Sequence, residues 1–191
     1  MEKFIVGKLQ KELPDDLKYH ALAHTIDVTN AAEANGITEG ISGDELILLK
    51  TAALFHDAGF IKTYTKNEPV AVEYAKEFLP LFGYSQEQIQ TIADMILSTQ
   101  LPQSPKTLLE EILCDADLDY LGRKDFYEIG ERLKEELLIK GLINDEVEWD
   151  DLQIKFLERH SYFTKTAMLS RSEEKEKRLE EIKIRRLSNE A

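Results

Sequence analysis

Apolar residues recur every three or four positions along almost the whole chain, which is the spacing of one face of an α-helix. Phe126, Ile129, Leu133 and Leu137 show this spacing clearly. Residues 46–55 are apolar almost all round, which predicts a central, buried helix. No segment stands out as alternating apolar and polar residues in the manner of a half-buried strand. Helices are therefore expected at about residues 4–13, 19–35, 44–58, 69–82, 85–97, 108–121, 125–139 and 149–163, and from residue 170 onward.

Capping and turn residues separate these helices. Ser85 with Gln88 three residues later is a capping box, which typically opens a helix. Gly36 is expected just past the end of the helix that begins at residue 19. Pro102 and Pro105 indicate a loop between two helices. The sequence therefore predicts an all-α, bundle-like fold.

The length of the chain favours one domain. At 191 residues, of which 42% are hydrophobic, the chain can bury a core of its own. We expect one domain over residues 1–191, with its core at about 15–165 and a charged C-terminal helix at 166–191. Leu179 and Ile182 form a thin apolar seam on that helix. The seam could pack on the body of the protein, which we favour, or on a second copy in a homodimer.

The net charge of the chain limits the classes of partner that it is expected to bind. There are 37 acidic and 24 basic residues, for a net charge of −13. Such a surface disfavours duplex nucleic acid, which is bound by neutralising phosphates, and anionic membrane surfaces. No apolar segment approaches the ~20 residues needed to span a bilayer. Cys114 is the only cysteine, so no intrachain disulfide can form, and the N-terminus lacks the apolar stretch of a signal peptide. A cytoplasmic location is expected.

A histidine and an aspartate stand together at the end of the central apolar segment. His56 and Asp57 are followed by Gly59, which indicates a helix end. Adjacent residues on a helix point about 100° apart, so both can reach one ion only at such an end or where helices converge. An aspartate near a helix C-terminus is electrostatically unfavourable unless a cation compensates. The alternative is a hydrogen-bonded core histidine beside an aspartate in a turn.

Two other groups could supply metal ligands. His20 and His24 are four residues apart, which places them on one face of the expected helix. The alternative is a surface helix with two exposed histidines. Asp115, Asp117 and Asp119 lie in an otherwise apolar run, where a carboxylate is costly unless something positive neutralises it. One of the three could bind a metal, and the others could cap neighbouring helices.

The order of these residues resembles the H…HD…D signature of the HD superfamily of metal-dependent phosphohydrolases. The resemblance spans residues 19–119 and implies the helical bundle of an HD domain. Asp117 is chosen over Asp115 because its Ala-Asp-Leu setting resembles that of the last family aspartate. The metal ligands that the resemblance implies are His24, His56, Asp57 and Asp117.

A second resemblance concerns the segment before His24. Tyr19 and His20 are similar to the start of the Tyr-His-Asn-(x)2-His element of cyclic-nucleotide phosphodiesterases, although Ala21 replaces the asparagine. The first histidine of that element donates a proton, so the resemblance implies that His20 is a general acid. After the His-Asp pair no histidine follows until His160, so the usual imidazoles of a second metal are missing. This favours the single-metal type, and the aromatic neighbours of His160 predict a packed histidine.

Two imidazoles and two carboxylates suit one divalent ion. Mn²⁺, Fe²⁺, Co²⁺ and Mg²⁺ fit such a set, and Zn²⁺ or Ni²⁺ are alternatives. The ion would polarise a phosphoryl oxygen and lower the pKa of a bound water, with Asp57 and His20 as the catalytic residues. Lys62 and Arg123 follow the two metal-binding segments and are candidates for binding the phosphate of a substrate.

The resemblance implies a phosphohydrolase. The expected substrate is a small nucleotide or related phosphorylated metabolite, either a monoester or a diester. Two alternatives stay open. One is a regulatory HD module that binds a nucleotide with little turnover. The other is a helical interaction domain that docks through its charged C-terminal helix.

Overall fold

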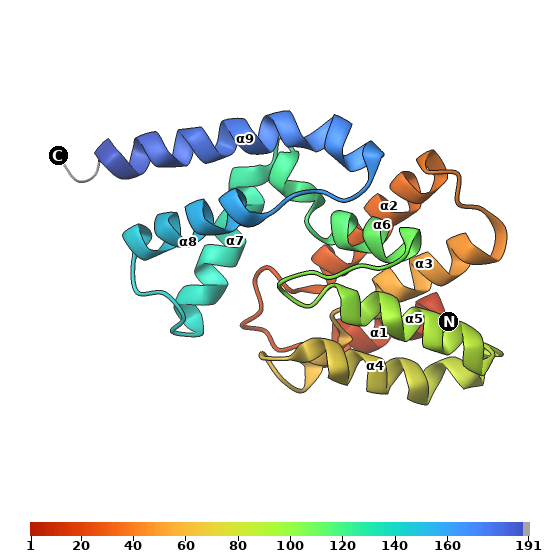
Figure 1. Ribbon diagram of the computed structural model, residues 1–191. Helices are drawn as coiled ribbons and strands as arrows, with labels where there is room; N and C mark the ends of the chain where they lie inside the picture. Colours follow the sequence, from red (N-terminus) through yellow and green to blue (C-terminus); the bar gives the residue numbers. More distant parts are fainter. Residues whose placement is uncertain (189–191) are drawn as a thin grey trace.

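The computed structural model describes residues 1–188, which form helices joined by loops, with no β-strand among them (Figure 1). The expected all-α fold is therefore confirmed. Short 3-10 helices follow three of the α-helices: η1 (Ala58–Ile61), η2 (Leu79–Phe82) and η3 (Asp119–Gly122). The α-helices are α1 (Glu2–Glu12), α2 (Leu22–Thr38), α3 (Gly43–Phe55), α4 (Asn67–Phe78), α5 (Gln86–Ser98), α6 (Leu108–Asp117), α7 (Phe126–Ile139), α8 (Glu146–Arg159) and α9 (Lys165–Ser188).

Helices α1 to α6 surround one hydrophobic cluster, which we call the core cluster. Helix α3 lies at its centre, as the apolar segment predicts, and Leu49, Ala52 and Phe55 have no exposed surface. Helix α2 packs closely on α3 at Gly36, where an added Cβ would lie 2.8 Å from Leu49 Cδ2. This close packing places His24 of α2 near the C-terminal end of α3.

A second hydrophobic cluster, the C-terminal cluster, joins η3 to α7, α8 and α9. In Figure 1, α9 runs beside α8 and η3, on the opposite side of the molecule from α4 and α5. Ile182 has no exposed surface and Leu179 packs against the cluster. The seam of the C-terminal helix therefore packs on the body, as we favoured, and Arg185 of the same helix pairs with the buried Asp150 of α8.

Several predicted boundaries need correction, among them those of α8, which spans Glu146–Arg159 and not 149–163 because the Asp145 side chain caps its start. Helix α2 begins at Leu22, so His20 lies in the segment before the helix and does not share a helix face with His24. The same helix continues through Gly36 to Thr38, because the glycine serves close packing on α3 and does not end the helix. The last helix begins at Lys165, five residues earlier than expected. The capping box at Ser85 is confirmed, with both reciprocal hydrogen bonds present.

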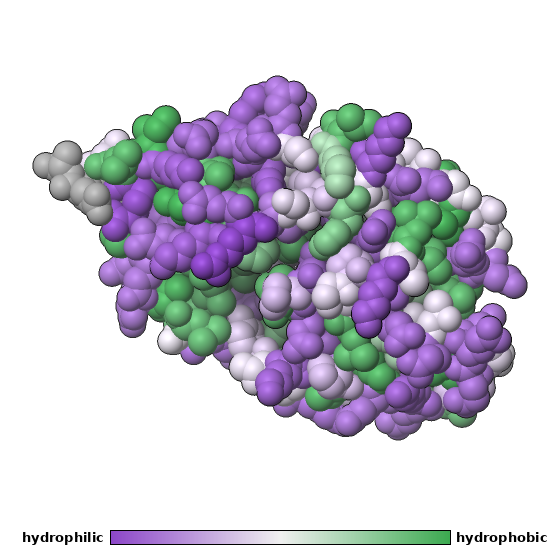
Figure 2. All heavy atoms as spheres, viewed as in Figure 1, coloured by the Kyte–Doolittle hydropathy of each residue, from purple (hydrophilic) through white to green (hydrophobic). Residues whose placement is uncertain are grey.

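The surface agrees with the strongly acidic composition. Hydrophilic residues cover most of the face in Figure 2, and apolar residues are exposed in separate patches. Over residues 1–188, none of the helices combines the length and the apolar character that a bilayer crossing requires.

Candidate metal centre

Three helices of the core cluster converge on one point. His24 lies in the first turns of α2, His56 caps the C-terminal end of α3, and Asp117 is the last residue of α6. Asp57 follows His56 directly, before η1 begins. Because α3 ends at this point, the adjacent histidine and aspartate can both face the same small space.

The ligating atoms of these residues lie at the spacing of a coordination shell. His24 Nε2 is 3.1 Å from Asp117 Oδ1, 3.4 Å from His56 Nε2 and 3.4 Å from Asp57 Oδ2. His56 Nε2 is 3.2 Å from Asp57 Oδ2 and 3.5 Å from Asp117 Oδ1. Adjacent ligands at roughly 2.0–2.2 Å from one ion, in tetrahedral or octahedral directions, lie about 2.8–3.6 Å apart. These five separations fit a single ion: the ligating atoms of His24, His56 and Asp117 all lie within 4.8 Å of one another, and Asp57 approaches both histidines.

The hydrogen bonds around the site also leave ligating atoms available to a cation. His56 Nδ1 donates a hydrogen bond to the Ala53 carbonyl at 2.7 Å, which leaves the Nε2 lone pair directed at the centre. Asp57 Oδ2 is buried and has no hydrogen-bond partner among the described residues. A buried carboxylate oxygen without a donor is costly, and a bound cation would satisfy it.

Charge and burial shift the pKa values of the groups at this centre in opposite directions. Burial acts to lower the pKa of His56, but the carboxylates of Asp57 and Asp117 outweigh it and raise that pKa well above its usual value. Burial acts to raise the pKa of both aspartates, but the neighbouring histidines lower both. The two carboxylates therefore stay ionised, and the centre attracts a positive charge, which a divalent ion supplies more fully than a proton.

The three clustered aspartates have different partners. Asp115 accepts hydrogen bonds from the backbone N–H groups of Phe163 and Thr164 and from the Thr164 hydroxyl, at 2.7–2.9 Å, so it caps α9. Asp119 pairs with Arg171 at 2.8 Å. Only Asp117 of the three joins the histidines. Its selection over Asp115 agrees with this geometry.

Glu68 in the first turn of α4 also lies near the centre. Burial raises the pKa of its carboxyl, and the negative charges of Asp57 and Asp117 add to this effect. Its Oε2 atom is buried without a hydrogen-bond partner among the described residues. Gly59 brings α4 this close, because an added Cβ would lie 1.9 Å from the Asn67 carbonyl oxygen.

His20 stands beside the centre and is held by a residue that sequence reasoning missed. Its ring stacks on Phe60, with the centroids 4.2 Å apart, and its centroid is 5.9 Å from that of His24. Its Nδ1 atom lies 2.5 Å from Oε1 of Glu136, a buried residue of α7. The sequence contains one clue to Glu136: it lies seven residues after Ile129 and three after Leu133, on the inner stripe of an amphipathic helix.

An apolar cavity of about 290 Å³ adjoins the centre on one side. His20 and Asp117 lie in its wall together with Tyr19. The rest of the wall is mostly aromatic or aliphatic, and Gln153 supplies an amide. The aromatic members from η3, α7 and α8 are Tyr120, Phe126, Trp149 and Phe156.

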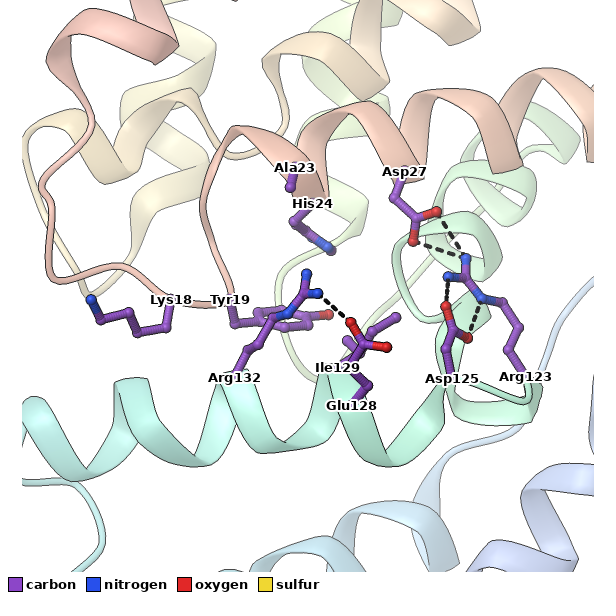
Figure 3. Close-up of a pocket in the computed structure, with 10 residues that line it drawn as sticks. All are labelled: Lys18, Tyr19, Ala23, His24, Asp27, Arg123, Asp125, Glu128, Ile129 and Arg132. Atoms are coloured by element: carbon purple, nitrogen blue, oxygen red, sulfur yellow. Dashed lines mark hydrogen bonds and ion pairs between the residues drawn. The ribbon is translucent and has the colours of Figure 1, made fainter.

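A polar pocket of about 250 Å³ adjoins His24 on another side (Figure 3). Arg123 lies in it, as expected of a residue near the centre, and it donates to both oxygens of Asp27 at 2.9 and 2.8 Å. Asp125 and Asp119 also face its guanidinium. A substrate phosphate would therefore have to compete with three carboxylates for Arg123, whose role in binding substrate stays a prediction.

Lys62 lies elsewhere. Its Nζ atom is 4.7 Å from the centroid of the Tyr74 ring, a cation–π contact, and it does not line either pocket beside the centre. Lys62 therefore lies outside both pockets, and its role in binding the substrate phosphate stays a prediction. His160 is packed between aromatic rings, as predicted, with Tyr162 at 4.7 Å and Phe156 at 6.0 Å between centroids.

Comparison with known proteins agrees with this geometry. The HD domain family matches residues 21–119, which include all four residues of the centre. Because the match covers more than half of the chain, the chain belongs to the HD domain family. No curated protein matches the chain significantly.

Two solved structures share its fold. A predicted HD superfamily hydrolase from an uncultured Thermotogales bacterium is 22% identical, with a TM-score of 0.65, and the match covers 99% of this chain and 92% of that one. YpgQ of Bacillus subtilis, solved in complex with ADP, is 20% identical, with a TM-score of 0.68 and coverage of 100% and 97%. At these identities the likeness establishes the fold alone.

Proposed function

We propose that this protein is a metal-dependent phosphohydrolase that cleaves a phosphoester of a small nucleotide or related phosphorylated metabolite. The observation that carries the proposal is the set of five separations, 3.1–3.5 Å, among the ligating atoms of His24, His56, Asp57 and Asp117. The description of one structural neighbour as an HD superfamily hydrolase also supports it.

The donor set favours one divalent ion with open positions. Two imidazole nitrogens and two carboxylate oxygens suit Mn²⁺, Fe²⁺, Co²⁺ or Mg²⁺, and Zn²⁺ or Ni²⁺ are alternatives. When bound, such an ion would polarise a phosphoryl oxygen and lower the pKa of a water molecule. The centre offers no further histidine for a second ion among the described residues.

The side chains around the ion would each have a role in catalysis. Asp57 and its neighbours would hold the ion, and Glu68 could orient the attacking water through its unpartnered oxygen. As the water oxygen bonds to phosphorus, the bond to the leaving oxygen breaks and His20 gives that oxygen its Nε2 proton. The proton that the attacking water loses goes to solvent and a proton from solvent returns to Nε2 of His20, so the sum is one water consumed for each ester cleaved.

The apolar cavity supports a substrate with a flat, largely apolar group. A nucleobase could lie against its aromatic walls, with the Gln153 amide within the same cavity. The complex of YpgQ with ADP supports the same class of ligand. The charge of the phosphate would then lie at the ion rather than at a basic side chain, because no lysine or arginine lines this cavity.

The test is a hydrolysis screen of the purified protein. Nucleoside mono-, di- and triphosphates, cyclic nucleotides and aryl phosphates would be offered with added Mn²⁺, Co²⁺ or Mg²⁺, and released phosphate or nucleotide would be measured. We expect turnover that a chelator abolishes and that the His56→Ala, Asp57→Ala variant lacks. Tight nucleotide binding without turnover in metal-replete buffer would instead favour a regulatory module. Unchanged activity in the double variant would contradict the proposal.

A further inference from the structure

One buried carboxylate has no place in the metal centre. Glu136 lies on α7 and has no exposed surface, although it belongs to an amphipathic helix whose other acids face solvent or lie at its edge. An ionised carboxylate is costly to bury unless several donors satisfy it. The hydrogen-bond donors that surround Glu136 therefore indicate its role.

Glu136 holds both the backbone and the ring of one residue. Its Oε2 atom accepts hydrogen bonds from the backbone N–H groups of Tyr19 and His20, at 2.9 and 3.1 Å. Its Oε1 atom accepts from the His20 ring at Nδ1, at 2.5 Å, and from the Tyr64 hydroxyl at 2.9 Å. Burial acts to raise the pKa of Glu136, but these donors, above all His20, lower it to about 2. The carboxylate is thus an acceptor only, and all four donors point to it.

This arrangement places a proton on Nδ1 of the His20 ring and restricts the orientation of the ring. Because an ionised carboxylate can only accept, Nδ1 of His20 must carry a proton. Stacking on Phe60, with an angle of 24° between the rings, holds one face of the imidazole. The ring lines the apolar cavity together with Asp117, so its other nitrogen, Nε2, is the one left for a group bound there.

We propose that Glu136 is a positioning residue, which orients His20 and keeps a proton on Nδ1, so that a second proton, carried on Nε2 of the doubly protonated ring, can pass to the leaving oxygen of the substrate. The inference rests on the proposed phosphohydrolase function, and it assigns a role to a residue outside the segment that matches the HD family. A carboxylate that orients an imidazole in this manner contributes to the rate without touching the substrate.

The kinetic test compares substrates that differ in their need for a proton donor. In Glu136→Ala and the isosteric Glu136→Gln, kcat for an alkyl phosphate, whose leaving oxygen is strongly basic, should fall about 10- to 100-fold. For p-nitrophenyl phosphate, whose leaving group needs no proton, kcat should change less than about threefold, and KM for both should hold. In a His20→Ala background, the Glu136 substitution should cause no further fall, because the two residues act as one unit.

Two variants serve as controls. Glu135→Gln removes the neighbouring exposed carboxylate of the same helix and should leave both substrates unaffected. Tyr64→Phe removes one donor to Glu136 while leaving the His20 contacts, and it should cost less than the Glu136 variants. An equal loss for both substrates in the Glu136 variants, or a full further loss in the His20→Ala background, would overturn the inference.

A second measurement does not depend on the variants folding. Nitrogen-15 NMR of the metal-free wild-type protein reports, for each His20 nitrogen, whether it carries a proton. We expect Nδ1 to be protonated, and a ring with a free Nδ1 lone pair would overturn the inference even if the enzyme is active. A wild-type protein that hydrolyses no phosphoester would overturn the proposed function and this role with it. Hydrolysis with unimpaired Glu136 variants would overturn this role alone.

Discussion

The core cluster and the C-terminal cluster contribute differently to the site. Of the four candidate metal ligands, His24 lies on α2, His56 and Asp57 follow the end of α3 and Asp117 ends α6, and these helices enclose the core cluster. Helices α7 and α8 contribute no ligand among the described residues, but they supply Glu136 and much of the cavity wall. We infer that the first region holds the ion and the second orients the proton donor and selects the substrate.

The largest expected effect comes from removing a metal ligand, which tests whether ion binding and nucleotide binding depend on different regions. His56→Ala removes one ligand of the proposed ion, so kcat/KM should fall on the order of 10³-fold or more, equivalent to about 4 kcal/mol of transition-state stabilisation. Nucleotide affinity, measured calorimetrically without metal, should change little, because His56 does not line the cavity and much of its wall comes from the other region. A variant with wild-type kcat/KM would contradict the division of roles.

The next effect tests whether the two clusters unfold separately. Phe126 and Phe55 are both fully buried, one in each cluster. Replacing either by alanine should lower the free energy of unfolding by about 3–5 kcal/mol. Hydrogen exchange should then locate the damage: Phe126→Ala should expose amides of α7 to α9, and the matched Phe55→Ala those of α1 to α6. Equal loss of protection throughout in both variants would mean that the clusters form one cooperative unit.

A smaller effect on the free energy of unfolding distinguishes Asp115 from Asp117, the candidate ligand on the same helix. Asp115→Asn should lower the free energy of unfolding by about 1–3 kcal/mol, because the buried carboxylate accepts three hydrogen bonds at the start of α9. Metal affinity should be retained, since Asp115 is not among the grouped ligands. Thermal unfolding and metal titration check the two halves of the prediction. Loss of the metal in Asp115→Asn would show that the ligand was misassigned.

The smallest effect is a dependence of stability on pH that arises in the C-terminal region. Burial, aided by the charge of Lys175, lowers the pKa of His160 to about 4. The unfolded chain therefore takes up a proton near pH 6.5 while the folded chain does not. Stability should fall as the pH drops from 6.5 to 4 and level off below, by on the order of 1 kcal/mol once solvent screening is allowed for. His160→Phe should flatten this slope in denaturant titrations, and an unchanged slope would exclude His160 as its source.

The fold and the four candidate ligands were the parts most open to prediction from sequence. The helices follow from apolar periodicity, and the buried position of α3 follows from a segment that is apolar on all sides. His24, His56, Asp57 and Asp117 could be selected because metal ligands are of few residue types and the resemblance fixes their order. The geometry then brings the four together from positions up to 93 residues apart.

What could not be predicted depends on contacts between distant segments. His20 was expected on the face of a helix, but Glu136 binds its backbone N–H and that of Tyr19 across 116 and 117 residues, and the helix begins after them. Arg123 was expected to be free for phosphate, but its carboxylate partners include Asp27, 96 residues away. Local patterns carry no information on such pairings, because a charged residue on an amphipathic helix is ordinarily solvated.

The most direct test of the central claim is the number of metal ions bound per chain. The wild-type protein, incubated with Mn²⁺ and then desalted, would be analysed by mass spectrometry of its metal content, beside Asp117→Asn and the matched Asp115→Asn. We predict about one ion per chain in the wild type and in Asp115→Asn, and almost none in Asp117→Asn. A wild-type protein that retains no ion across the divalent metals, or an Asp117→Asn variant that retains as much as the wild type, would contradict the claim that these four side chains hold one ion.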